Sequence, residues 1–359
     1  MVSRLALIFC CVVAVVASTT ATAGAAPDRG PLRSWIVAGA AALDAWYVPK
    51  TGVYETTNWW NAANELQAQL VSSKLLGDTR GMEHAATTYD AKIDTSFQND
   101  FYDDEGWWAL TWVQAYDITH EHRYLVLAES LFTDIASGWD RTCGGGIWWS
   151  KSRDYKNAIP NELFISLAAK LALRTQGAAS ANYRTWAELD WNWFHSSGMI
   201  NDRNLVNDGL SSNCRNNAGT IWSYNQGVIV DGLTDLYKLT GQHDYIDSAT
   251  RIAKSAMSSL TDKSGILHEP CEPMCNVDQT QFKGIFVRSL VSLNQIAPSS
   301  DYLQFATRNA NAIWYANSNL HHQFGLRWNG SVDTVDASRQ GSALDCLNSA
   351  MRLGSKLDG

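Results

Sequence analysis

The sequence lacks the features that mark several large classes of protein. Its 359 residues carry a net charge of −8 and contain no run of basic residues, so nucleic acid and anionic lipid are poor partners for it. Beyond the first residues, no stretch is long and apolar enough to span a bilayer. No stretch alternates strongly enough for a sizeable sheet, and no Pro- or Ser-rich linker divides the chain. These absences favour one soluble helical domain.

The first residues have the pattern of a secretion signal. Arg4 gives a positive start, residues 5–16 form an apolar run, and residues 21–23 (Ala-Thr-Ala) form a small-residue cleavage site. A membrane anchor is the alternative, but the run is short for one, and the last residues lack the tail of a lipid-anchor signal. We therefore expect a signal peptide over residues 1–23 and a secreted protein, extracellular or in the cell-wall space, without a membrane anchor. Asn329, in an Asn-Gly-Ser sequon, is then a candidate glycosylation site.

Five of the seven cysteines remain once residues 1–23 are removed. In an oxidising compartment cysteines are expected to form disulfides, although the sequence does not determine their connectivity. The expected state is Cys143–Cys214 and Cys271–Cys275, with Cys346 left over. A zinc site formed by the closely spaced pair and His268 is the alternative, which the compartment disfavours.

Helical periodicity dominates the rest of the chain. Apolar residues recur at helical spacing in twelve segments, which are residues 32–47, 58–76, 79–95, 105–118, 122–137, 157–175, 180–197, 221–240, 242–260, 279–297, 300–317 and 339–355. The segments fall into six consecutive pairs. An α-solenoid is the alternative arrangement, but the pairs share no clear sequence repeat. We therefore predict an all-α fold, an (α/α)6 barrel of six helical hairpins, as a single domain over residues 24–359.

The densest chemistry lies in residues 99–108, where four carboxylates occupy six positions directly before two tryptophans. Crowded carboxylates repel one another unless solvent, a cation or a partner relieves the repulsion, and the faces of indoles suit sugar rings. Cleavage of a glycosidic bond uses two carboxyl groups, one ionised and one protonated. We therefore take Asp103 and Asp104 as the candidate catalytic pair.

The acidic cluster can also be interpreted as a helix cap or as a calcium site. Asp103 or Asp104 can act as a helix N-cap, with the neighbouring acids solvated in the first turn, although a cap leaves the flanking aromatic residues without a role. Calcium binding is less well supported, since with Gly106 as the loop glycine the first and last EF-hand ligand positions fall on Phe101 and Trp112. The sequence also lacks a serine-hydrolase elbow and the histidine spacing of zinc peptidases.

Aromatic residues are abundant, with 16 Trp and 13 Tyr, and several occur in pairs. Most are expected in the core. Neighbours on a helix diverge by about 100°, so the members of a pair cannot all face inward. We expect some of them to line a groove, and Trp60, Tyr102 and Trp107 are candidates for contact with a sugar.

Six motifs occur in order along the chain. They are WWNAANE at 59–65, YDDEGWW at 102–108, CGGGIWW at 143–149, KNAIPNE at 156–162, YNQG at 224–227 and residues 278–288, which include FKG. Together they resemble glycoside hydrolase family 76, the endo-α-1,6-mannanases, and the fungal cell-wall branch described as Dfg5-like shares the pattern. The resemblance covers nearly the whole chain after residue 23.

The resemblance implies an (α/α)6 barrel that cuts α-1,6-mannan or mannooligosaccharides with retention, by double displacement, without a cofactor or metal. By position, Asp103 resembles the nucleophile and Asp104 the general acid/base. Retention would place the two carboxyl groups about 5–5.5 Å apart, and the rate would follow a bell-shaped curve on the acidic side of neutrality. Positions that resemble sugar-binding groove residues are Asn61, Trp148, Asn157, Tyr224 and Asp278.

Simpler roles compete with some of these assignments. Asn157, Asn161 and Asp278 can serve as helix caps, and Lys156 and Lys283 can be solvated surface charges. Two other functions also stay open: a transglycosidase acting on mannose-containing cell-wall or lipid-anchor glycans, and a mannan-binding protein without turnover. No oligomeric state follows from the sequence.

Overall fold

A computed structural model describes residues 29–355, and the predicted signal peptide at residues 1–23 lies outside the described part. The described chain forms twelve α-helices and one two-stranded antiparallel sheet. The elements are α1 (Arg29–Asp44), β1 (Tyr47–Val48), β2 (Val53–Tyr54), α2 (Trp59–Leu76), α3 (Arg80–Lys92), α4 (Tyr102–Thr119), α5 (His122–Ser137), α6 (Ala158–Ala172), α7 (Gly177–Ser196), α8 (Ser223–Thr240), α9 (His243–Ser259), α10 (Phe282–Ile296), α11 (Ser300–Ala316) and α12 (Ala337–Gly354). Short 3-10 turns η1 (Ile93–Thr95), η2 (Thr142–Gly144) and η3 (Gln279–Gln281) complete them.

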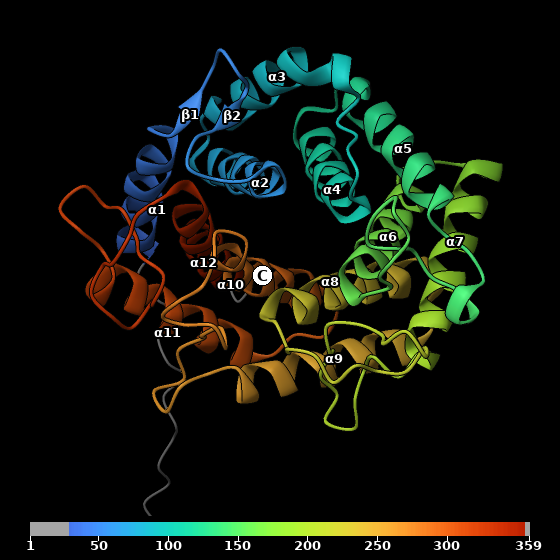
Figure 1. Ribbon diagram of the computed structural model, residues 1–359. Coiled ribbons are helices and arrows are strands. Elements are labelled where there is room, and N and C mark those ends of the chain that lie inside the picture. Colours follow the sequence, from blue (N-terminus) through green and yellow to red (C-terminus); the bar gives the residue numbers. More distant parts are fainter. Residues whose placement is uncertain (1–28, 356–359) are drawn as a thin grey trace, which may run out of the picture.

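The helices form two concentric rings (Figure 1). The even-numbered helices pack side by side in sequence order, and α12 closes the inner ring against α2. The odd-numbered helices lie outside, each beside an inner helix. This arrangement confirms the predicted (α/α)6 barrel.

Burial follows the ring to which a helix belongs. In α6, an inner helix, every residue except Lys170 is buried. In α9, an outer helix, the buried residues form one stripe at helical spacing, which includes Tyr245, Ala249, Ile252 and Ala256. A helix surrounded by protein must be apolar on most faces, whereas an outer helix needs only one apolar stripe.

The connections between helices differ at the two ends of the barrel. Short links such as Gly77–Thr79 lead from an inner helix to the next outer helix, whereas most connections from an outer helix back to an inner one are long, such as residues 138–157 and 197–222. The N-terminal ends of all six inner helices therefore open at the same mouth, beneath the long connections. Long loops on a rigid scaffold are where binding groups are usually found.

Buried amides fix three of the long connections to the inner helices. Asn161 on α6 accepts from the backbone N–H of Ile147 at 2.6 Å, and Gln226 on α8 accepts from Val206 at 2.8 Å. Gln340 on α12 accepts from the N–H of Phe324 at 2.9 Å. Each bond satisfies a buried backbone group that has no helix partner. The same kind of bond, from a buried side-chain amide to the backbone of a long connection, thus recurs on three inner helices, although the sequence shows no repeat.

Two disulfides secure the same end of the molecule. Cys143–Cys214 joins two of the long connections and Cys271–Cys275 closes a short loop before α10, while Cys346 is a buried free thiol. These are the pairs expected from the sequence, and the zinc alternative at Cys271 and Cys275 was wrong because the two sulfurs are bonded to each other. Asn329 is exposed, so its glycosylation stays a prediction.

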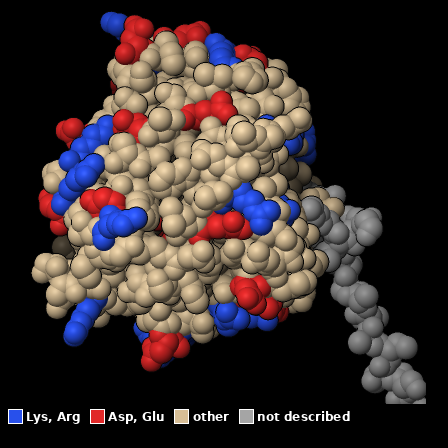
Figure 2. All heavy atoms as spheres, turned by 90° about the vertical axis from the view of Figure 1, so that its right-hand side faces the viewer, with Lys and Arg blue, Asp and Glu red and all other residues tan. Residues whose placement is uncertain are grey.

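The surface carries charges of both signs. Figure 2 shows acidic and basic side chains scattered over one side of the molecule, without a large patch of either sign. Within residues 29–355, no helix combines the length and apolar character that crossing a bilayer requires.

Candidate active site

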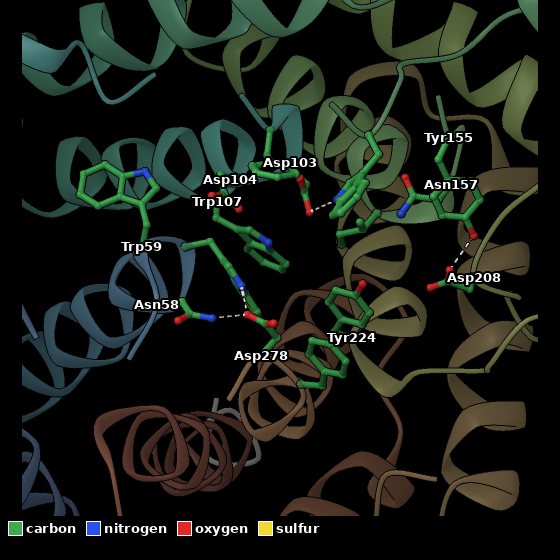
Figure 3. Close-up of a pocket in the computed structure, with 15 residues that line it drawn as sticks. Asn58, Trp59, Asp103, Asp104, Trp107, Tyr155, Asn157, Asp208, Tyr224 and Asp278 are labelled. Carbon is green, nitrogen blue, oxygen red and sulfur yellow. Dashed lines mark hydrogen bonds between the residues drawn. The ribbon is translucent and has the colours of Figure 1, made fainter. Parts of the chain in front are cut away.

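A cavity of about 590 Å³ lies at the mouth of the barrel. We call it the mouth cavity (Figure 3). Its walls come from the N-terminal ends of the inner helices and from the long connections above them. The lining residues are Asn58, Trp59, Trp60, Phe101, Asp103, Asp104, Trp107, Trp149, Tyr155, Asn157, Ile159, Asp208, Tyr224, Asp278 and Phe282. Four carboxylates therefore face a space at the positive ends of the helix dipoles, which partly offset their repulsion.

Four aromatic rings from four inner helices lie together in this cavity. Trp60 stacks on Trp107 with ring centroids 5.4 Å apart, and Trp107 on Tyr224 at 6.3 Å. Tyr224 stacks on Phe282 at 3.8 Å, and Phe282 lies 6.1 Å from Trp60, which closes the group. All four side chains are buried, and all four line the cavity. Such an apolar group disfavours ionisation of any carboxyl group beside it.

The two candidate catalytic residues lie in the first turn of α4. The sequence predicted a helix from residue 105, but α4 begins at Tyr102, with Phe101 at the N-cap position. The Asn99 side chain accounts for the earlier start, because its oxygen accepts from the N–H of Phe101 at 2.8 Å. Neither Asp103 nor Asp104 is the N-cap, so the interpretation of this pair as a helix cap was wrong.

Asp103 is half-buried and contacts the loop after η2. Its Oδ2 accepts from the Trp149 indole N–H at 3.1 Å, and its Oδ1 is buried without a hydrogen-bond partner. Burial raises the pKa of Asp103 well above its usual value, and the neighbouring charge of Asp104 adds to the rise. The bond from Trp149 opposes it.

Asp104 has its own donor. Its Oδ2 accepts from the Asn99 side-chain amide at 2.6 Å. Burial raises the pKa of Asp104 to about 6; the bond from Asn99 lowers this pKa, and the charge of Asp278 raises it. Burial thus raises the pKa of both carboxyl groups of the pair.

Glu105, the third acid of the cluster, is fully buried and does not line the mouth cavity. Its Oε1 accepts from the Lys151 ammonium at 2.9 Å and from the N–H of Asn99 at 3.3 Å. Burial raises the pKa of Glu105 to about 8, with a further rise from Asp134 that Lys151 opposes. Glu105 therefore ties the start of α4 to the loop that carries Trp149.

Two more carboxylates face the cavity from other walls. Asp278, opposite the aspartate pair in Figure 3, accepts at Oδ1 from the Asn58 amide at 2.7 Å and from the Trp60 indole at 2.8 Å. Asp278 occupies the N-cap position of η3 but makes no side-chain cap bond, so the alternative role as a helix cap was wrong. Asp208 accepts from the Tyr155 hydroxyl at 2.6 Å, and burial raises its pKa.

Five of the eight predicted sugar-binding residues line the mouth cavity. They are Trp60, Trp107, Asn157, Tyr224 and Asp278. Asn157 occupies the N-cap position of α6 but makes no side-chain cap bond, and its Oδ1 is buried without a partner. That oxygen is available to a ligand.

The other three predicted residues do not line this cavity. Asn61 is fully buried below it. Tyr102 packs against Gly138, where a methyl group would lie 2.6 Å from its ring. Trp148 donates to Asp140 of its own connection at 2.8 Å and lines a separate hollow. Adjacent residues leave a backbone in different directions, so a motif can contribute residues that line the cavity, such as Trp149, beside residues that do not, such as Trp148.

Sequence reasoning missed eight lining residues. They are Asn58, Trp59, Phe101, Trp149, Tyr155, Ile159, Asp208 and Phe282. Trp59 and Trp149 belong to tryptophan pairs, and Ile159 and Phe282 lie in the motifs at 156–162 and 278–288, so the sequence marked these four segments without showing which side chains face the cavity. Asp208 lies in a loop whose path depends on the Cys143–Cys214 bond, and no local pattern reveals that.

Lys156 and Lys283 are buried rather than solvated. The Lys156 ammonium donates to Asp140 at 2.8 Å and to three backbone carbonyls of the same connection. Lys283 donates to Glu272 at 2.5 Å and to a backbone carbonyl. Both lysines therefore hold long connections in place. Among the described residues, no three His, Cys, Asp or Glu side chains are grouped as metal ligands.

Comparison with protein families and known proteins gives one result at three levels. A sequence model described as glycosyl hydrolase family 76 matches residues 41–356. The mannan endo-1,6-alpha-mannosidase DCW1 of Saccharomyces cerevisiae is 32% identical over 270 residues, which cover 68% of this chain and 59% of that protein. Its namesake in Candida albicans is 31% identical over 220 residues, which cover 55% and 48%. The matches thus span about half of these two relatives.

A solved structure shares the fold. It is an inactive variant of an α-1,6-mannanase from Salegentibacter sp., with two consecutive aspartates replaced by asparagine, in complex with α-1,6-mannotriose. The TM-score is 0.81 at 20% sequence identity, and the match covers 90% of this chain and 99% of that one.

Proposed function

The chain belongs to glycosyl hydrolase family 76, and from that premise we propose that it is a retaining endo-α-1,6-mannosidase. One observation carries the proposal: two consecutive carboxyl groups face a single cavity with an aromatic floor, and each has a separate hydrogen-bond donor. The names of the fungal relatives and the aspartates replaced in the inactive mannanase agree with it.

In the proposed first step, Asp103 attacks the anomeric carbon while Asp104 gives its proton to the leaving glycosidic oxygen. The C–O bond to the leaving sugar breaks as the bond to the Asp103 carboxylate forms. In the second step, Asp104 takes a proton from water, the resulting oxygen attacks the same carbon, and Asp103 leaves. Two inversions retain the configuration.

The raised pKa of both carboxyl groups is compatible with these roles, because the ionisation of one carboxyl group disfavours that of the other. The active form of the pair carries one negative charge, on Asp103, and one proton, on Asp104. Positive charge develops at the anomeric carbon in the transition state and stabilises the carboxylate nearest to it. The buried Oδ1 of Asp103, which has no partner, gains from this charge, so the transition state favours the negative charge on Asp103.

The other polar groups of the mouth cavity suit a neutral sugar. Asp278, Asp208 and the Asn157 oxygen are acceptors for sugar hydroxyl groups, and the aromatic rings offer faces for stacking. With four carboxylates in the lining, an anionic sugar would be repelled. No metal or cofactor is part of the proposal.

We also propose that the barrel is a single catalytic domain of a secreted protein. Two disulfides support this localisation, since such bonds persist in oxidising compartments.

The test uses linear α-1,6-mannan. The wild-type protein should release oligomannosides, and NMR should show the α-anomer as the first product. Asp103→Asn and Asp104→Asn should each lower kcat by roughly 10²–10⁴-fold, whereas Asp244→Asn, on the exposed start of outer helix α9, should leave it unchanged. Mannan binding without release by the wild type would contradict the proposal and favour a mannan-binding protein.

The same assay with an added acceptor sugar tests the transglycosidase alternative. Either water or a sugar hydroxyl can resolve the intermediate of a double displacement. Elongated products that exceed hydrolysis products at low acceptor concentration would contradict hydrolysis as the main activity.

A further inference from the structure

A second hollow lies beside the mouth cavity, against Phe101 and Trp149. This hollow, of about 600 Å³, is lined by Asp100, Phe101, Trp149, Ser150, Lys151, Ser152 and Asp154, and we call it the outer groove. Phe101 and Trp149 line both spaces. We propose that the outer groove is a further sugar-binding subsite, which holds another mannosyl unit of the chain that is cleaved in the mouth cavity. This inference rests on the proposed function.

Trp149 is a fixed and exposed platform between the two spaces. Its indole N–H is bonded to Asp103, and its ring lies 4.9 Å from the Phe101 ring at 51°. Its backbone is held at both polar groups, since its N–H donates to Tyr155 at 2.8 Å and its C=O accepts from Tyr102 at 3.0 Å. The residue is nevertheless 36% exposed. A platform that is already immobile loses little conformational entropy when a sugar stacks on it.

The rim of the outer groove offers hydrogen-bond acceptors. Asp100 and Asp154 are exposed, and neither carboxylate has a hydrogen-bond or ion-pair partner among the described residues. The Ser152 hydroxyl shares a bond of 2.6 Å with Ser150 and can still bond outward. Carboxylates beside an aromatic ring match a sugar, which presents hydroxyl donors at its edge and C–H groups on its face.

The charges of the groove favour a neutral sugar over an anionic group. Among the described residues that line it, the only cation is Lys151, which is engaged by Glu105 at 2.9 Å and by Asp134 at 2.8 Å. A phosphate or carboxylate would therefore meet two unpaired carboxylates of this lining and a lysine whose charge is already balanced. The groove suits another unit of the same uncharged polymer.

A subsite here makes turnover depend on chain length. An oligosaccharide long enough to pass Trp149 gains contacts that the shortest substrate cannot make. The measurement is kcat/KM on α-1,6-mannooligosaccharides of increasing length, with labelled reducing ends that report which bond is cut. Wild type should show a stepwise rise in kcat/KM at one chain length.

Two variants impair the outer groove and leave the residues of the catalytic centre unchanged. Asp154→Ala deletes an acceptor and Ser152→Trp fills the space. Each should lower kcat/KM on the long oligosaccharides by about 10-fold, abolish the stepwise rise and change the bond that is cut. The shortest cleaved oligosaccharide should be unaffected, and Asp244→Ala on α9 should match wild type on every substrate.

The outcomes separate this inference from the proposed function. If both variants match wild type on every length, or lower kcat/KM equally on short and long chains, the outer groove is not a subsite, although the enzyme still cleaves mannan. If the wild type cleaves no α-1,6-mannooligosaccharide, the proposed function itself fails. Calorimetry with α-1,6-mannotetraose then decides the groove: binding weakened by Asp154→Ala supports it, and unchanged or absent binding overturns it.

Discussion

At the scale of single residues, each carboxyl group of the aspartate pair accepts a hydrogen bond from a neutral side chain. Asn99 donates to Asp104, and Trp149 donates to Asp103. The sequence revealed the pair because four acids crowd into six positions. It did not reveal Trp149 as a partner, because that contact spans 46 residues of sequence. Such contacts depend on the path of a whole loop, which no local pattern contains.

Replacing Asn99 with Ala should shift the pH dependence of the enzyme. The singly ionised pair forms as the pH rises through about 6, the pKa of Asp104 in the free protein, so kcat/KM should rise through that pH. The Asn99 donor stabilises the ionised carboxylate and thereby lowers this pKa. In Asn99→Ala the acid limb should move to higher pH, and kcat should fall by about 10-fold. An unmoved acid limb would contradict the role of this bond.

Asp278→Asn should move the same limb in the opposite direction. The negative charge of Asp278 raises the pKa of Asp104, so its removal makes Asp104 easier to ionise. The acid limb of kcat/KM should therefore shift to lower pH. KM should also rise, because Asp278 is a proposed acceptor for a sugar hydroxyl. The measurement is the pH–rate profile of both variants beside wild type, and shifts of the same sign in both would refute the assignment.

At the scale of elements, helical periodicity was sufficient to find every helix of the described chain. The predicted bounds of α5 agree with the structure, and those of α11 differ by one residue. The consequential error was the start of α4, which the structure places at Tyr102. That start depends on a side chain three residues upstream, Asn99, bonding to the backbone of Phe101. Periodicity describes the faces of a helix, whereas its first residue is decided by such individual bonds.

The amide bonds from inner helices to long connections should contribute measurably to stability. Gln226 is fully buried and bonds both the N–H and the C=O of Val206. Gln226→Ala should lower the free energy of unfolding by about 1–3 kcal/mol, because buried backbone groups lose their partners. Gln295→Ala, at an exposed position in α10, should change it by less than about 0.5 kcal/mol. Denaturant unfolding measures both, and equal effects would contradict the argument.

At the scale of the whole molecule, the barrel axis is divided into layers. The acidic mouth cavity lies above the four aromatic rings, and below them the inner helices enclose a network of charges. Arg288 lies 5.8 Å from the Trp107 ring and bonds Asp345 at 3.0 Å, while Lys170 bonds Asp231 at 2.8 Å. The closure of the ring by α12 brings Asp345 into this network. This layer could not be predicted from the sequence. Its residues belong to different inner helices, and residues that contact one another across the barrel axis are far apart in the chain.

The folded molecule contains many carboxyl groups whose pKa is raised. Burial is the main cause in each case, and it raises the pKa of Asp345 to about 6, of Glu269 to about 7 and of Glu105 to about 8. A carboxyl group whose pKa is higher in the folded state holds its proton while the unfolded chain releases it. Folding stability is then fully present below the unfolded pKa, near 4, and is lost as the pH rises toward the folded pKa.

The temperature of the thermal unfolding midpoint should therefore decrease as the pH rises from 5 to 8. A variant of Glu162 tests this explanation. This side chain is fully buried on α6, neither oxygen has a hydrogen-bond partner, and burial raises its pKa well above the usual value. Glu162→Gln keeps the neutral shape and removes the titration. Because one retained proton makes stability fall by about 1.4 kcal/mol per pH unit, the variant should match wild type below the unfolded pKa and exceed it increasingly as the pH rises from there toward the raised folded pKa. Parallel pH profiles of the free energy of unfolding would show that Glu162 is ionised in the folded protein.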